Sequence, residues 1–172
     1  MLPNNQPKPE SDLEETVIQV KRVSQKTKGG NTIGFSVLTV IGNKKGRIGI
    51  GLGKGPDVAS AIRKGFTQAK KRQITVPIKG YTIPHKIVHK YGAAKIMLKP
   101  ALPGTGLIAG GSVRPVLAAV GIHDIIAKIQ GTRNAITNVY CVFEALQNLK
   151  TSPEPGKETL TKSKSKPTPK IK

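Results

Sequence analysis

The chain has 172 residues, enough for one ordinary domain or two small ones, and 37% of them are hydrophobic, enough for a modest core. Its formal net charge of +20 is far above what solubility requires, and it indicates a polyanionic partner, nucleic acid before an acidic membrane surface. A single cysteine, Cys141, excludes an internal disulfide framework, and no apolar run approaches the roughly 20 residues that span a bilayer.

Both ends of the chain are predicted to lack fixed structure. Residues 1–15 contain three prolines and no apolar period, so we expect a flexible arm. Residues 150–172 contain seven lysines and almost no apolar residue, so we expect a disordered basic tail. The polar, partly acidic start has the features of neither a secretory signal nor an organellar transit peptide, which favours a cytoplasmic protein.

Residues 16–72 are predicted to form a basic α+β unit, a three-stranded antiparallel sheet with one helix packed on it. Alternating or β-branched residues predict strands at 16–24, 32–41 and 47–53. Glycine and lysine mark the two connections between these strands as basic turns, which can contact phosphates as well as reverse the chain.

The third strand and the helix after it carry two informative patterns. Every second residue of the strand is glycine, at 49, 51 and 53, so one face lacks side chains and another group can approach the backbone closely. The helix is expected to have Pro56 in its first turn and Asp57 next to it, which favours the helix dipole. Its apolar stripe comprises Val58, Ile62, Phe66 and Ala69, and the other side carries Arg63, Lys64, Lys70 and Lys71.

Residues 73–149 are predicted to form a second unit of sheet and helix with a separate core. Strands are expected at 74–78, 81–90, 94–99 and 124–130. One helix is expected to be capped by Ser112 and to end near Gly121. A last helix, capped by Asn134, carries an apolar stripe of Ile136, Val139, Tyr140, Phe143, Leu146 and Leu149.

The distribution of charge says more than its total. Eighteen Lys and Arg residues fall between Lys21 and Lys99, against a single acid, Asp57. A solvated surface without a partner normally mixes the two signs to limit self-repulsion. The segregation therefore predicts a surface that lies against phosphates.

The glycine-rich stretch at 103–111 has the pattern of a nucleotide-binding turn. Gly104, Gly106 and Ala109 fit the fingerprint G-x-G-x-x-A between a strand and a helix N-terminus, an arrangement that cradles anions. A ribose-binding acid belongs at the C-terminal end of the following strand, but Asp124 stands at its beginning, and the preceding strands resemble hairpins. A nucleotide-binding enzyme that uses the turn at 104–109 is therefore only the alternative, and the glycines are expected to allow a tight crossover.

Other candidate catalytic or metal-binding groups lack the partners that such sites need. The glycines at 49–55 lack the first glycine and the metal-binding hydroxyl of a phosphate loop. His85 and His89 are four residues apart, but they alternate as on a strand, so we expect them to face solvent or RNA. Cys141 lies among apolar residues of a helix and is expected to be a small buried hydrophobe. We therefore predict no catalytic residue, no metal ligand and no cofactor.

The low aromatic content narrows the kind of nucleic acid. Only 3% of residues are aromatic and none is Trp, so a platform that stacks single-stranded bases is hard to build. Basic turns, a glycine-lined backbone and a basic helix suit folded, double-helical RNA that is read by shape. No membrane partner is predicted, because the chain lacks a long helix with Trp or Phe opposite lysines.

Six short stretches stand out along residues 16–149: Val20-Lys21-Arg22-Val23, Lys28-Gly29-Gly30, the run from Gly46 to Lys54, Ala61-Ile62-Arg63-Lys64, Thr82-Ile83-Pro84-His85, and the run from Lys99 to Arg114. In this order they resemble the bacterial type of small-subunit ribosomal protein five, a family shared with organelles. Each piece is weak alone, and together they are specific. The resemblance implies an N-terminal domain similar to double-stranded-RNA-binding domains and a C-terminal domain of the fold named after the family.

The resemblance also implies a function and a set of neighbours. It implies a structural role in the small subunit, contact with small-subunit rRNA, and a place near messenger RNA entry that affects decoding accuracy. It implies ribosomal proteins four and eight as neighbours, with Gly104, Gly106 and Arg114 in the region that faces protein four. With the family's RNA-contacting loop included, the candidate RNA-binding residues are Lys21, Arg22, Lys26, Lys28, Gly29, Gly30, Lys44, Lys45, Arg47, Lys54, Arg63 and Lys64.

The chain departs from the family pattern at two places. Asn31 stands where the family usually has Arg, which removes an expected phosphate contact, and Ala135 stands where the last helix usually begins with proline. The residues leave open whether the compartment is the bacterial cytoplasm or an organelle. They also leave open a regulatory RNA-binding protein that works outside the ribosome.

Overall fold

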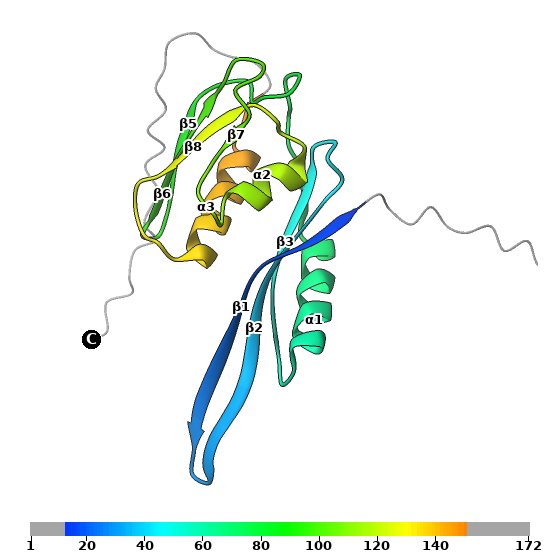
Figure 1. Cartoon of the computed structure of the whole chain (residues 1–172), viewed down its shortest axis with the longest axis vertical. Helices are drawn as coiled ribbons and strands as arrows, with labels where there is room; N and C mark the ends of the chain where they lie inside the picture. The colour runs from blue at the N-terminus through cyan, green and yellow to red at the C-terminus, as the bar shows by residue number, and fades with distance from the viewer. Residues whose placement is uncertain (1–12, 151–172) are drawn as a thin grey trace, which may run out of the picture.

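The structure, a computed structural model, describes residues 13–150 of the chain. These residues form two four-stranded sheets and three helices (Figure 1). This arrangement confirms the α+β class. The first sheet narrows at one end into a long two-stranded ribbon, and the second sheet with its helices lies beside the other end. Most of the predicted N-terminal arm and nearly all of the predicted basic tail lie outside the described residues.

The first sheet is antiparallel, with the strand order β1-β2-β3-β4. Its elements are β1 (Glu14–Thr27), β2 (Gly30–Gly42), β3 (Arg47–Gly55), the helix α1 (Val58–Lys71) on one face, and β4 (Gln73–Thr75). The three predicted strands and the helix are confirmed. The strand predicted at 74–78 for the second unit instead supplies β4, because it pairs with residues 47–49 of β3. The sheet therefore has four strands rather than three.

Strand β1 is longer at both ends than the sequence predicted. It begins at Glu14, so the last residues of the predicted flexible arm already belong to the sheet. It ends at Thr27, which leaves only Lys28 and Gly29 for the first of the two predicted basic turns. The polar residues near this turn have no apolar alternation, but their backbone groups pair with β2 in continuous register. Backbone pairing alone therefore extends the hairpin past the apolar pattern.

The glycine face of β3 is covered by α1, which confirms the predicted close approach to this backbone. A Cβ atom added to Gly49, Gly51 or Gly53 would lie 2.2, 2.1 or 1.9 Å from a backbone oxygen of the helix. Real Cβ atoms do not approach oxygen so closely, so the helix can lie here only because these side chains are absent.

The start and the buried line of α1 both differ from the sequence prediction. The helix begins at Val58 with Asp57 as its N-cap, so Pro56 precedes the helix instead of lying in its first turn. The buried residues are Ala61, Gly65 and Ala69, whereas most of the predicted stripe is only half-buried. Packing of helix backbone against strand backbone leaves room only for small side chains, and this requirement outweighs the position of the larger apolar residues.

The N-cap of α1 predicts a pH dependence. The hydroxyl and the backbone amide of Ser60 donate to the Asp57 carboxylate and hold the pKa of that group below its ordinary value. The resulting stabilisation is present above the unfolded pKa of about 3.9 and is lost as the pH falls through the lower folded pKa. In thermal unfolding, Asp57→Asn, which keeps a neutral cap, should therefore lie below wild type at about pH 7 and approach it near pH 3. A constant difference in Tm would contradict this.

The second sheet has the strand order β5-β6-β8-β7. Its elements are β5 (Ile87–Tyr91), β6 (Ala94–Pro100), β7 (Leu107–Ile108), α2 (Arg114–Val120), β8 (Ile125–Ile129) and α3 (Ala135–Gln147). Strand β7 is parallel to β8 and the other pairs are antiparallel. The strand predicted at 81–90 begins only at Ile87. Before it, Pro84 cannot donate a backbone hydrogen bond, and only an isolated bridge joins Lys79 to Thr82.

Of the two helix caps predicted in this unit, one is confirmed and one is wrong. The side chain of Asn134 accepts a hydrogen bond from the amide of Ile136 and caps α3. Ser112 does not cap α2, whose N-cap is Val113 without a side-chain hydrogen bond. The amides of Val113 and Arg114 instead donate to the carbonyl of Gly110, so a backbone turn satisfies this helix end. The helix ends at Gly121, as predicted.

The two units share one core, contrary to the separate core that was expected for residues 73–149. Helices α2 and α3 lie between the two sheets (Figure 1). Buried Leu38, Val40, Ile48 and Ile50 of the first sheet join the same apolar cluster as the residues of these helices. The amide of Lys44 also donates to the carbonyl of Ala119 at the end of α2, with an N···O distance of 3.1 Å. The two units therefore pack as one body.

Candidate nucleic-acid interface

The narrow end of the first sheet forms a projecting hairpin, which we call the hairpin extension (residues 20–33). Every residue in it is exposed, and Figure 1 shows it running away from the rest of the molecule. It carries Lys21, Arg22, Lys26, Lys28, Gly29 and Gly30, half of the predicted RNA-binding set. No acid occurs between Glu15 and Asp57, so the positive charge of the extension has no opposite charge nearby in sequence.

The register of the sheet places these cations on two faces. In the sheet, Arg22 lies opposite Phe35 of β2, and Phe35 lies opposite Gly55 of β3, whose side-chain position faces α1. Arg22 therefore lies on the face of the sheet that α1 covers, and Lys26, four residues further along the same strand, lies on that face as well. Lys21 pairs with Ser36, which pairs with Lys54, so these two lysines lie in one row on the other face. Two strand spacings separate them by roughly 10 Å. A phosphate backbone can therefore meet basic side chains on either side of the extension.

Helix α1 adds the next cations on the helix face. Arg63 and Lys64 are exposed, as are Lys71 and Arg72 near its end. Lys70 is engaged in an ion pair with Glu15, with an Nζ···Oε1 distance of 2.9 Å. Arg63 and Lys64 therefore lie on the same side of the first sheet as Arg22 and Lys26, and RNA contact by these residues stays a prediction.

The turn at 42–46 lies at the opposite end of the same hairpin. Strand β2 has 13 residues, so the predicted sites Lys44, Lys45 and Arg47 lie roughly 40 Å from Lys28. Lys44 also forms an ion pair with Glu14, with an Nζ···Oε2 distance of 2.6 Å. The twelve predicted RNA-binding residues therefore do not form one site. RNA contact by this second group stays a prediction.

An acidic side chain of the same chain, that of Asp124, accepts a hydrogen bond from the glycine turn before α2. The amide of Gly106 donates to Oδ1 of the buried Asp124 with an N···O distance of 2.8 Å. Gly104 and Gly106 have φ values of +87° and +76°, which permit the tight crossover that was expected. A carboxylate at this amide repels a phosphate, so the turn is a poor cradle for a nucleotide. Arg114 is exposed at the start of α2.

The prediction that His89 faces solvent or RNA is wrong. The His89 side chain is only 13% exposed, and its Nε2 lies 3.0 Å from Oε2 of Glu144, so it faces α3 and not solvent or RNA. Within residues 13–150, no group of three or more His, Cys, Asp and Glu side chains is placed to hold a metal ion. Within the same residues, no helix has the length and apolar character to cross a membrane.

Cys141 is buried, as predicted, and its reactivity can be tested. Burial raises the pKa of the Cys141 thiol, and the Sγ donates to the carbonyl of His89 at 3.4 Å. Because the thiolate is the reactive form, a thiol reagent should label the native chain at least about 100-fold more slowly than the urea-unfolded chain. Rapid labelling of one thiol in native buffer would contradict this burial.

One group of polar residues at the junction of the two units was not predicted from the sequence. Gln19 of β1, Asn138 of α3 and Arg133 before α3 border a cavity of about 520 Å³. The available signal was Asn138, a polar residue adjacent to Val139 in the apolar pattern of α3. Gln19 could not be linked to it, because 119 positions of sequence separate the two residues.

Comparisons with known proteins agree with the two-part fold. The N-terminal domain of ribosomal protein S5 matches residues 13–77, and its C-terminal domain matches residues 89–159. The small ribosomal subunit protein uS5 of Chloroflexus aurantiacus is 48% identical over 80% of this chain and 78% of its own length. Protein uS5c of Pyropia yezoensis is 47% identical, and protein uS5 of Thermosynechococcus vestitus is 45% identical, each over 87% of this chain and 86% of its own length.

These matches decide between a small-subunit ribosomal protein and a nucleotide-binding enzyme. Both family domains occur in order, and the relatives cover most of the chain at high identity. The nucleotide-binding enzyme that the glycine turn suggested is therefore wrong. The chain belongs to the ribosomal protein S5 family of the small ribosomal subunit, a family of structural proteins and not of enzymes.

Proposed function

We propose that the chain binds small-subunit rRNA through the hairpin extension and the adjoining face of α1. The observation that carries this proposal is the extension itself, which is fully exposed, basic and free of acidic residues. Val20, Val23 and Ile33 remain 43–45% exposed, so the hairpin has no closed apolar core of its own, which favours a partner that covers it. Phosphates are the partner that its charge selects.

The extension suits a folded RNA helix better than a single strand. No aromatic residue occurs in residues 20–33, so stacking on bases has no platform there. Cations on both faces of a slender ribbon can instead contact phosphates on the two sides of a groove. The shape of the RNA, and not its base sequence, would then be recognised.

The proposal also assigns protein neighbours to the other end of the molecule. Leu102 is 79% exposed, Tyr81 67% and Ile108 52%, which supports an apolar contact near the glycine turn and Arg114. Ribosomal protein four is proposed to cover this surface. Ribosomal protein eight as a second neighbour, the place near messenger RNA entry and the effect on decoding accuracy rest on the family resemblance alone.

The salt dependence of binding tests the RNA proposal. The affinity of the full chain for small-subunit rRNA should fall steeply as salt is added. In a plot of the logarithm of the binding constant against the logarithm of the salt concentration, each phosphate contact should contribute roughly −0.7 to −0.9 to the slope. With four cations on the extension and two on α1, a slope of about −4 or steeper is expected. A single-stranded RNA of equal length should bind more weakly. An affinity that stays flat between low and high salt would overturn the proposal.

A further inference from the structure

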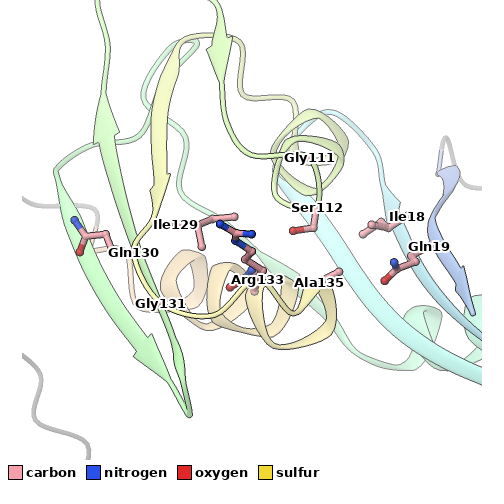
Figure 2. Close-up of a pocket in the computed structure, with 10 residues that line it drawn as sticks. Ile18, Gln19, Gly111, Ser112, Ile129, Gln130, Gly131, Arg133 and Ala135 are labelled. Atoms are coloured by element: carbon pink, nitrogen blue, oxygen red, sulfur yellow. The ribbon is translucent and has the colours of Figure 1, made fainter.

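The second sheet has one face that no helix or strand of residues 13–150 covers. Both helices of this unit lie on its other face, between the two sheets (Figure 1). His89 contacts α3, and Ile96 and Leu98 are buried in the core, so the residues that alternate with them point away from the helices. Figure 2 shows this alternation at the end of β8, where the side chains of Ile129 and Gln130 extend to opposite sides. We call the uncovered face the lysine face, formed by residues 88 and 90 of β5, 95, 97 and 99 of β6, and 126 and 128 of β8.

Met97 stands at the centre of the lysine face, with a lysine on three of its four sides. Lys95 and Lys99 are its neighbours along β6, and Lys128 lies opposite it on β8. Val88 lies opposite it on β5, so the fourth side is apolar. Met97 and Val88 are half-buried, and the three lysines are exposed. A small apolar pair is therefore bordered by positive charge.

The lysines of this face have no opposite charge beside them. Lys90 lies directly opposite Lys95, and like charges at such a cross-strand pair destabilise a sheet. No acidic residue occurs in β5, β6, β7 or β8, and among residues 13–150 no ion pair involves a lysine of this face. Lysines on an edge strand can prevent aggregation, but Lys95 and Lys99 lie on β6, which is an inner strand. The charge therefore indicates an acidic partner.

Strand β5 offers backbone hydrogen bonds at the border of the lysine face. It is an edge strand, and a two-residue turn after Tyr91 joins it to β6. The residues that flank such a turn, Tyr91 and Ala94, bond to each other, so every second residue of β5 bonds to β6. Val88 and Lys90 therefore turn their N–H and C=O groups outward, where no strand of residues 13–150 lies. An extended polypeptide has donors and acceptors for both kinds of group, whereas phosphates have only acceptors.

We propose that the lysine face and the outer edge of β5 bind an extended acidic segment of a partner protein. The segment adds to β5 as an antiparallel strand, with one apolar side chain on Val88 and Met97. Acidic side chains two residues to either side lie near Lys90 and near Lys86, which is exposed just before β5. RNA fits less well, because phosphates would leave the apolar pair uncovered. This surface is separate from the hairpin extension, so the inference goes beyond the proposed function.

Titration with a designed peptide tests the chemistry of the partner. The probe is the end-blocked peptide Thr-Glu-Thr-Val-Thr-Glu-Thr, which carries the acidic–apolar–acidic pattern on one side of a strand. Added to the isotope-labelled full chain, it should shift the amide signals of Val88, Lys90 and Met97 in a saturable way. The same peptide with lysine in place of both glutamates should bind at least about tenfold more weakly. Methylation of its valine nitrogen should weaken binding roughly five- to tenfold, because strand pairing loses a hydrogen bond.

Two variants with the same change of charge test where the peptide binds. The double variant Lys90→Gln with Lys95→Gln should bind the peptide at least about fivefold more weakly and keep its rRNA affinity within about threefold. The matched double variant Lys26→Gln with Lys28→Gln, in the hairpin extension, should bind the peptide as wild type and lose rRNA affinity. All four side chains are exposed, so both variants should fold.

The outcomes separate an acidic protein segment from other partners. Equal binding of the glutamate and lysine peptides, or no shift with either, would overturn the proposal. Unchanged binding of the methylated peptide would overturn the added strand. A short RNA duplex that shifts the same three amide signals and displaces the peptide would also overturn the proposal, because RNA would then occupy this face. If the peptide binds as described while rRNA affinity stays flat with salt, the lysine face is supported and the proposed function is overturned.

Discussion

Gly53→Ala is expected to destabilise the chain by at least about 3 kcal/mol, a fall of roughly 10 °C in Tm. The added methyl carbon would lie 1.9 Å from the backbone oxygen of Ala61 and 2.5 Å from the amide nitrogen of Gly65. Neither atom can turn away as a side chain can, so α1 must move off the sheet. Gly51→Ala should be comparably severe, because its Cβ would lie 2.1 Å from the oxygen of Gly65. Urea and thermal unfolding of the full chain measure both effects.

Gly29→Ala is the matched control for these substitutions. A Cβ at Gly29 would meet no atom within 4 Å, so the same chemical change should alter stability by less than about 0.5 kcal/mol. If Gly53→Ala unfolds at the same temperature as wild type, the close contact of α1 with β3 is wrong. The glycines of β3 would then need an explanation outside the sheet, such as a bound backbone.

Neutralising the hairpin extension is expected to have the largest effect on RNA binding. In the variant with Lys21, Arg22, Lys26 and Lys28 all changed to Gln, the salt slope of rRNA binding should become shallower by roughly three to four units. Affinity at about 0.15 M salt should fall by 100-fold or more, because several phosphate contacts are lost together. Stability should change little, since all four side chains are exposed and no buried contact is removed.

An equal change of charge elsewhere provides the control. Lys95, Lys99, Lys128 and Lys150 are exposed in the second unit, and changing all four to Gln removes the same net charge. This variant should retain most of the affinity, apart from a small loss of long-range attraction. If the two variants lose affinity equally, the net charge and not the extension determines binding.

Much of the fold follows from local patterns in the sequence. The alternating glycines of β3 predicted a close approach to its backbone, and the approaching group is α1. Asn134 and Gly121 correctly mark a helix start and a helix end, because capping depends on residues only a few positions away. The prediction for Ser112 was wrong although the group that takes its place is equally close in sequence. The carbonyl of Gly110, which the sequence pattern does not display, satisfies the first amides of α2.

Features that depend on long-range pairing were harder to predict. The strand at 73–75 carries no local mark that assigns it to the first sheet, and only pairing with residues 47–49 places it there. The position of Lys44 far from Lys28 depends on the length of β2, which the apolar pattern alone underestimates. The positive charge of the extension was predictable from charge segregation, but its length was not, because backbone pairing alone carries β1 to Thr27. The cavity between Gln19 and Asn138 was not, because it exists only once both units pack together.

Salt washing of small ribosomal subunits tests the central claim most directly. Tagged wild-type chain and the four-residue extension variant are each expressed in cells, and the subunits are sedimented at increasing salt. The wild-type chain should sediment with small-subunit rRNA at about 0.1 M salt and be released only at much higher salt, whereas the extension variant should already be free at the lower concentration. Equal retention of both chains at every salt concentration would contradict the claim that the hairpin extension binds the rRNA.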